Sequence, residues 1–295
     1  HLATPEDDRR HVPGPDALPL WNESFWFPFY DPQQEIGVVF RIGMYPNRGQ
    51  ANVFLFITHH GEVVHALIDL QAPLPPAEAG RLGLLGLQIE WERPRERFRL
   101  RYRSGAHGFD VQWEAVSPTY CYPAPPGTTA EQVPRHIEQG GTVTGTVTIA
   151  DTAYPIACPG HRDHSWGGER DWAKFHRWTY LSGEFGRDFW FNAVRIAFAP
   201  GAELTIGCLW DGRELLELKT IALAVETADG GARQLGVDAR LIDERGREHH
   251  IVGEAVLAIA PVQYGRTWLK DAFTRYRYGD RVGYGILEHG YVEDA

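Results

Sequence analysis

The stretch GHRDHSWGGERDW, residues 160–172, holds the densest group of side chains in the chain that could do chemistry. Its positions include two His, two Asp, two Arg, one Glu and two Trp. Three kinds of site could use these residue types: a metal centre, an acid–base catalytic site, or a buried polar latch that holds the fold together. The surrounding sequence has to decide among them.

A metal centre is the least favoured of the three. His161 and His164 are three residues apart and His176 is the next His, so two His and a carboxylate could in principle bind zinc or iron. Three-residue spacing suits one face of a helix, however, and this segment is rich in Gly and lies among strand patterns. A CxxC pair, an HExxH pattern, a P-loop and a dinucleotide-binding fingerprint are all missing from the sequence. We therefore predict no metal and no other cofactor.

An acid–base site fits the residue types better. A carboxylic acid kept protonated by burial, or an imidazolium held by a carboxylate, can protonate an alkene, and indole faces can stabilise the resulting cation. Asp163 and His164 are predicted to be such an acid and its orienting partner. Glu23 lies among Trp residues and Glu288 among Tyr residues, so both are further acids. The predicted catalytic residues are His164, Asp163, Glu23 and Glu288, and the predicted substrate-binding residues are Trp166, Trp26, Trp172 and Tyr284.

The structural alternative uses the same residues. Asp163 and Arg170 could form a buried ion pair, with Trp166 as a plug in the core, and a paired buried charge needs no function to explain it. Trp172 and Arg170 fit the structural role better. His164 and Trp166 fit the functional role better, and Asp163 fits either.

Composition excludes several classes of protein. The chain has 295 residues and a net charge of −10, which opposes nucleic-acid binding. The Arg-rich run at 92–103 alternates with apolar residues, as one solvated strand face does. The cysteines Cys121, Cys158 and Cys208 are far apart, which indicates reduced thiols and a cytoplasmic protein. No apolar run reaches the roughly 20 residues of a membrane-spanning helix, so we expect no stable membrane insertion. Monomer and homodimer both stay open.

Short strand patterns separated by turn residues recur along the whole chain, which predicts an all-β protein. The Pro- and Gly-rich segment 123–141 is predicted to be a loop, and 267–280 a short helix with Trp268, Ala272 and Phe273 on one face. Both halves place paired Trp and an acid ahead of a series of strands, at 21–31 and 164–175. We therefore predict two antiparallel β domains, residues 1–155 and 156–295, with the 160–172 motif in the second.

The DHxWG core of the motif, residues 163–167, resembles the signature of the carotenoid 1,2-hydratase and AttH-like superfamily. WNESFWFPFYD (21–31) and GYGILEHGY (283–291) resemble an uncharacterised bacterial branch of it. The resemblance implies two lipocalin-like barrels packed side by side, with activity at the His and Trp of DHxWG, here His164 and Trp166. The strand RDFWFNAVR (187–195) lacks the Tyr-x-Asp pair of the hydratases, so the resemblance implies a related acid-promoted reaction rather than the carotenoid reaction itself.

Two functions follow as expectations. The first is a cofactor-free lyase or isomerase that hydrates, dehydrates, isomerises or cyclises a hydrophobic, isoprenoid-like alkene or alcohol. The second is a lipocalin-like protein that binds such a molecule without chemistry. An enzyme predicts that a carboxylate or His with a perturbed pKa faces the ligand, and a binding protein predicts that the ion pairs of the motif lie elsewhere.

Overall fold

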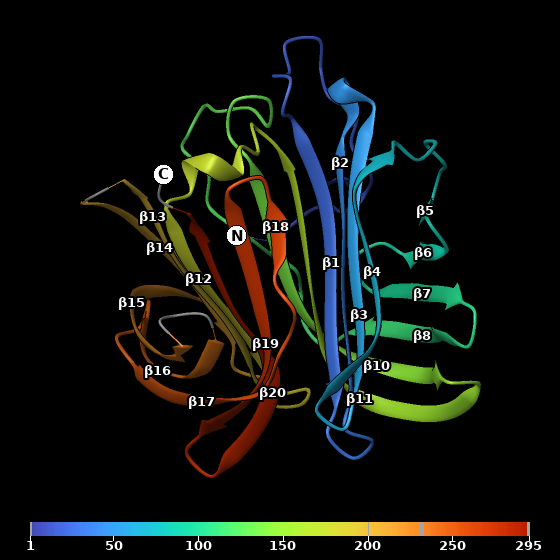
Figure 1. Cartoon of the computed structure of the whole chain (residues 1–295). Helices are drawn as coiled ribbons and strands as arrows, with labels where there is room; N and C mark the ends of the chain where they lie inside the picture. Colours follow the sequence, from blue (N-terminus) through green and yellow to red (C-terminus); the bar gives the residue numbers. More distant parts are fainter. Residues whose placement is uncertain (1, 200, 230–232, 294–295) are drawn as a thin grey trace. The chain divides into compact units, whose positions relative to one another are not determined.

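The computed structural model describes residues 2–199, 201–229 and 233–293. The chain forms two compact units, His1–Arg170 and Asp171–Ala295, each built on one antiparallel sheet (Figure 1). Both units are almost entirely strand, so the prediction of an all-β protein with two lipocalin-like domains is confirmed.

The first sheet runs in the order β4-β3-β2-β1-β11-β10-β8-β7-β6-β5, with β9 paired to β10. Its elements are η1 (Glu6–Asp8), β1 (Asn22–Asp31), β2 (Ile36–Tyr45), η2 (Pro46–Arg48), β3 (Gln50–His59), β4 (Glu62–Pro73), β5 (Arg81–Leu84), β6 (Leu87–Arg93), β7 (Arg97–Ser104), β8 (His107–Ala115), β9 (Tyr120–Cys121), β10 (Arg135–Ile149) and β11 (Thr152–Gly167). Alternate residues of β1, such as Phe25, Phe27 and Phe29, fill its apolar core. We call this core-lining side of the sheet the inner face and the opposite side the outer face.

The unit boundary lies at 170/171 rather than at the predicted 155/156. The reason is strand β11, which pairs with β10 from Thr152 to Trp166 and with β1 up to Gly167. Backbone hydrogen bonds on both sides therefore hold the DHSWG segment in the first sheet. The motif closes the first domain instead of opening the second.

The second unit is a closed barrel. Its elements are η3 (Trp172–Lys174), β12 (Arg177–Glu184), β13 (Trp190–Ala199), β14 (Ala202–Trp210), β15 (Leu215–Ala228), β16 (Arg233–Asp243), β17 (Glu248–Ala258), β18 (Val262–Tyr264), β19 (Thr267–Tyr278) and β20 (Arg281–Val292). The order is β17-β16-β15-β14-β13-β12-β20-β19-β18, and an additional pairing of β17 with β19 closes the ring. A separate apolar core, including Leu181 and Leu287, fills the barrel.

Two local predictions were wrong. Residues 267–278, within the predicted helix, form strand β19, which pairs with β20, β17 and β18, so sheet hydrogen bonds outweigh the weak helical pattern. The predicted loop 123–141 ends early, because β10 already begins at Arg135. Here the alternation of RHIEQ was obscured by the Pro and Gly residues on either side.

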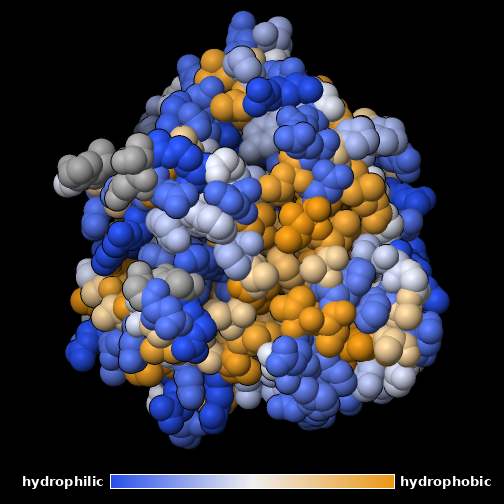
Figure 2. All heavy atoms as spheres, viewed as in Figure 1, coloured by the Kyte–Doolittle hydropathy of each residue, from blue (hydrophilic) through white to orange (hydrophobic). Residues whose placement is uncertain are grey.

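Apolar side chains gather broadly on one face of the molecule, over the region of β1 to β4 (Figure 2). Val63 and Ile68 of the edge strand β4 are among the exposed large apolar residues of this sheet. None of the described helices is long and apolar enough to cross a membrane.

Candidate functional site

Strand β11 sends neighbouring motif residues to opposite faces of the first sheet. His164 is in register with Phe25 and Ile137, so its side chain lies on the inner face. Asp163 is in register with Trp26 and Glu138, on the outer face. Because side chains alternate along a strand, these neighbours do not form the predicted acid–orienter pair. The motif contributes to two separate clusters.

The inner-face cluster is centred on Glu23. Its Oε1 accepts hydrogen bonds from the His11 backbone N at 2.8 Å and from His11 Nδ1 at 2.9 Å, and it lies 3.0 Å from His164 Nε2. Glu23 and His164 are both fully buried. Burial lowers the pKa of His164, although Glu23 opposes this, so the imidazole is held neutral. Burial would raise the pKa of Glu23, but the hydrogen bonds from both His outweigh it and the pKa is lowered.

Aromatic rings pack against this cluster, and His11 is its partly exposed member. The His11 ring stacks on Trp166 with centroids 4.5 Å apart, and Phe25 stacks on His164 at 4.1 Å. Trp166 itself packs with Trp21 and other apolar residues in a small core. The predicted catalytic His164 and Glu23 and the predicted ligand-binding Trp166 are therefore brought together, but under a cover made by the N-terminal segment.

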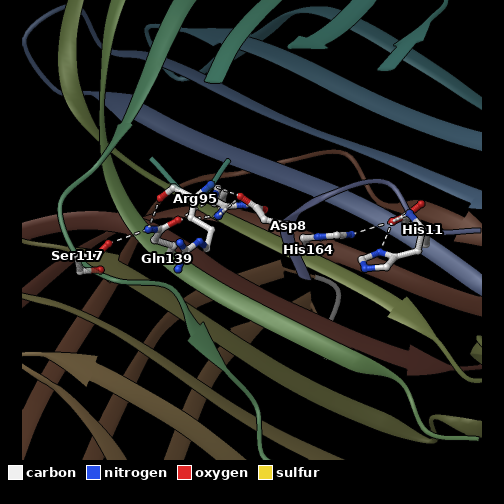
Figure 3. A network of polar contacts seen from close by, with 8 residues as sticks. Asp8, His11, Arg95, Ser117, Gln139 and His164 are labelled. Carbon is white, nitrogen blue, oxygen red and sulfur yellow. Dashed lines mark hydrogen bonds and ion pairs between the residues drawn. The ribbon is translucent and has the colours of Figure 1, made fainter. Parts of the chain in front are cut away.

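The same segment is fastened a second time, at Asp8 (Figure 3). Arg162, on the inner face of β11, donates to both carboxylate oxygens of Asp8, at 2.6 and 3.1 Å. Gln139 Oε1 accepts from Arg162 Nε and Nη2, and the Arg95 backbone N donates to Asp8. Arg162 is 1% exposed and Asp8 is fully buried. The inner face thus carries a buried polar latch, but a different one from the Asp163–Arg170 pair considered from the sequence. Its partners Asp8 and His11 were marked by no strand or motif pattern.

The outer-face cluster is centred on Glu138. Its Oε1 lies 2.6 Å from His136 Nε2, and its Oε2 lies 2.6 Å from His161 Nε2. Tyr122 Oη donates to Oε1 at 3.3 Å. Asp163 offers a carboxylate oxygen within 4.8 Å of the ligand-type atoms of both His136 and Glu138. Sequence reasoning missed Glu138 and His136 because they fall in the stretch interpreted as a loop.

The two carboxylates of this cluster have pKa values pushed in opposite directions. Burial favours the neutral form of Glu138, but His136 and His161 outweigh it and lower its pKa to about 2. Burial raises the pKa of Asp163 to about 6; His136 opposes the rise and the charge of Glu138 supports it. The surroundings therefore favour the anionic form of Glu138 and the protonated form of Asp163.

Polar groups continue along the outer face on both sides of Asp163. Ser24 and Ser165 share a hydrogen bond of 2.9 Å, and Arg170 Nη2 donates to Ser165 Oγ at 3.1 Å. Arg41 donates to Asn52 at 2.8 Å, across a glycine on β2. A Cβ on that residue, Gly43, would lie 2.4 Å from Arg41 Nη1, so the glycine makes room for the guanidinium. Trp26 contacts His161 edge-on, with centroids 6.5 Å apart.

The remaining predicted site residues belong to the second unit. Glu288, on β20, accepts a hydrogen bond from Trp178 Nε1. Tyr284 is in register with Glu184 on β12. Trp172 stacks on Tyr264 with centroids 5.3 Å apart, which fits the anchoring role expected for it. All three residues therefore lie in the second unit, whereas Asp163 and His164 lie in the first.

Two of the clusters contain donor atoms that a divalent metal could use. The nitrogen and oxygen atoms of His11, Glu23 and His164 lie within 4.8 Å of one another, as do those of His136, Glu138 and Asp163. Imidazole and carboxylate are donors that zinc and iron accept. The prediction that the chain binds no metal is based on the spacing of residues along the motif alone, and it stays a prediction.

Solved structures share this architecture. A protein provisionally designated AttH from Nitrosomonas europaea is 12% identical, with a TM-score of 0.66, over 95% of this chain and 98% of that one. Kievitone hydratase from Nectria haematococca is 12% identical, with a TM-score of 0.63, over 96% and 93%. CghA is 12% identical, with a TM-score of 0.64, over 100% and 97%. The expected resemblance is confirmed in the fold, which is the tandem lipocalin-like architecture of the AttH-like proteins.

Sequence comparison places the chain more narrowly. It belongs to the family described as a domain of unknown function (DUF7064), whose model matches residues 4–292. No curated protein sequence matches it significantly.

Proposed function

We propose that this protein is a lyase or isomerase of the hydratase or cyclase type, with Asp163 as the general acid. One observation carries the proposal: carboxylate oxygens of Asp163 and Glu138 and a ring nitrogen of His136 lie within 4.8 Å of one another, in surroundings that push the pKa of Asp163 up and that of Glu138 down. Such a separation is typical of paired groups with distinct acid and base roles. Two proteins of the same fold bear the names kievitone hydratase and CghA, and the first name supports a hydration chemistry.

The proposed step is a proton transfer to an unsaturated, isoprenoid-like substrate. The protonated Asp163 carboxyl gives its proton to one alkene carbon, which leaves a carbocation on the other and a carboxylate on Asp163. Water adds to the cation and returns a proton to that carboxylate, so hydration regenerates the acid. Run backwards, Asp163 protonates the departing hydroxyl group and water leaves. If an internal alkene attacks the cation instead of water, a C–C bond closes a ring and the positive charge moves to the other alkene carbon. Loss of a neighbouring proton to the Asp163 carboxylate then gives a neutral cyclic alkene and regenerates the acid.

The neighbours of Asp163 have supporting roles in this proposal. The Glu138 charge keeps Asp163 from ionising early, and His136 and His161 hold Glu138 in place. Trp26, in register with Asp163 on the same face, would offer an indole to the cation, worth about 0.5–2 kcal/mol. We assign His164, Glu23 and Trp166 to positioning β11. Glu288, which belongs to the second unit, has no step in this mechanism.

Solvent isotope exchange tests the proposal without a known substrate. Terpenoid alkenes and tertiary alcohols are incubated with the protein in D₂O, and deuterium uptake is measured by mass spectrometry. We expect uptake with the native protein and a loss of about 10²- to 10⁴-fold in Asp163→Asn. Asp16→Asn, at an exposed carboxylate, is the matched control. Native-like uptake by a folded Asp163→Asn variant would refute the role of Asp163.

The same experiment addresses the alternative of a non-catalytic binding protein. In that case the native protein binds members of the substrate panel but gives no more exchange than buffer does. Saturable binding, measured by quenching of Trp fluorescence, together with zero uptake across the panel would favour the alternative.

A further inference from the structure

A polar row crosses five strands inside the barrel of the second unit. Lys270 on β19 is in register with His289 on β20, which is in register with Thr179 on β12. Thr179 is in turn in register with Arg195 on β13, and Arg195 with Thr205 on β14. Cross-strand partners project to the same face of a sheet, so these five side chains form one continuous row.

The row faces the barrel interior. Two residues further along each strand lie Ala272, Leu287, Leu181 and Ala193, which are in register with one another and fully buried. Leu181, Leu287 and Ala193 belong to the apolar core of the barrel. Because side chains repeat faces every second residue, the polar row shares the interior face with this core. It forms the layer directly above the apolar filling.

This layer is strongly cationic. Lys270 is 6% exposed, and its Nζ lies 4.7 Å from the centroid of the Tyr291 ring. Burial and, to a smaller extent, the charges of Arg177, Lys270 and Arg195 together lower the pKa of His289 to about 4. His289 Nδ1 is buried and has no hydrogen-bond partner among the described residues. The buried ammonium of Lys270, the guanidinium of Arg195 and the neutral imidazole of His289 thus gather at one level of the barrel.

Rings and acids border the layer on its other side. The next row places Trp268 beside Tyr291 and Tyr291 beside Arg177. Asp271 and Glu288 adjoin Lys270 and His289 in sequence and therefore project to the opposite face of the sheet. Glu203 is an exposed residue of the next row, and Glu293 Oε2 accepts from Trp268 Nε1 at 3.4 Å. Cationic hydrogen-bond donors therefore lie in one row and aromatic rings in the next. The donors suit the charged group of an organic anion, and the rings suit its apolar part.

We propose that the row Lys270–His289–Thr179–Arg195 is a binding site for an organic carboxylate, with the apolar body of the ligand against Trp268 and Tyr291. Lys270 and Arg195 supply the charge, the Thr179 hydroxyl donates a hydrogen bond, and Trp268 and Tyr291 contact the body. The site lies in the second unit and does not depend on the chemistry proposed for Asp163.

Two matched probes test the charge requirement. Binding of 1-naphthoate and of the neutral 1-naphthalenemethanol to the whole chain is measured by isothermal titration calorimetry at pH 7 and low salt. We expect the dissociation constant of naphthoate to be at least about tenfold lower, as charge-assisted hydrogen bonds predict. Inorganic phosphate, titrated separately, is expected not to displace naphthoate at equal concentration, since it lacks the apolar body.

Variants locate the binding in the barrel. Lys270→Met and Arg195→Leu should each reduce the preference for naphthoate to within about twofold, with unchanged circular dichroism. Lys219→Met and Arg240→Leu are the controls, because Lys219 and Arg240 are exposed and should leave the preference intact. Equal affinity for the two probes, or a preference that survives Lys270→Met, overturns the proposal. Asp163→Asn should leave naphthoate binding unchanged, which separates this site from the proposed catalytic one.

Discussion

Asp163 shows how a single side chain acquires chemistry from its surroundings. It is half-buried beside Glu138. Burial, supported by the negative charge of Glu138, raises the pKa of Asp163 to about 6. His136 acts in the opposite sense, because its positive charge favours the Asp163 carboxylate. The apparent pKa therefore belongs to the cluster as a whole, and changes in its members should move it.

The first prediction concerns the pH dependence of turnover. Since the proposed acid must be protonated, kcat/KM should fall as pH rises through about 6, while Glu138 stays ionised throughout this range. In His136→Gln the charge that lowers the pKa of Asp163 is lost, so this fall should move to higher pH. A pH profile of isotope exchange measures both. His250→Gln, at an exposed His, is the control; an unchanged profile in His136→Gln would contradict the assignment.

At the scale of elements, strand β11 and the N-terminal segment depend on one another. The inner face of β11 carries Arg162 and His164. In the N-terminal segment, Asp8 binds Arg162 directly. His11 is linked to His164 through Glu23, which contacts both. The strand alternation of the motif could be anticipated from the sequence. The partners from residues 8 and 11 could not, because contacts across some 150 positions leave no local pattern.

The second prediction concerns this latch. Asp8→Ala leaves the buried Arg162 guanidinium without its carboxylate partner, so it should lower the free energy of unfolding of the first unit by about 3–5 kcal/mol. Urea denaturation followed by Trp fluorescence measures the change. Asp16→Ala, at an exposed position, should change it by less than about 0.5 kcal/mol. A comparable stability of the two variants would show that Asp8 and Arg162 are not coupled.

At the scale of the whole molecule, each unit has a large apolar core of its own, and the two cores share none of the described residues. The first includes Phe27, Phe40 and Trp113, and the second includes Leu181, Phe191 and Leu287. Every pairing among the described strands joins two strands of the same unit. The two units therefore have separate sources of hydrophobic stability, and perturbation of one core should be felt first in its own unit.

The third prediction follows from these separate cores. Leu181→Ala opens a cavity in the second barrel and should cost about 2–5 kcal/mol. We expect differential scanning calorimetry to show that the unfolding transition of the second unit moves to lower temperature. The component due to the first unit should keep its midpoint. Leu55→Ala, in the first core, should move the other component instead. A single transition that shifts equally in both variants would mean that the units unfold as one.

The sequence by itself determined the strand content, the two-domain layout and the place where the ionisable residues gather. These properties depend on local alternation, turn residues and composition, which are readable one segment at a time. The tertiary structure alone decided that Asp163 and His164 serve different faces, that the motif ends the first domain, and that residues 267–278 are a strand. Each of these outcomes depends on which strands pair. Pairing brings Glu23 to His164 on one face of the first sheet and Glu138 to His161 on the other. Hydrogen bonding between strands, rather than any local preference, places them.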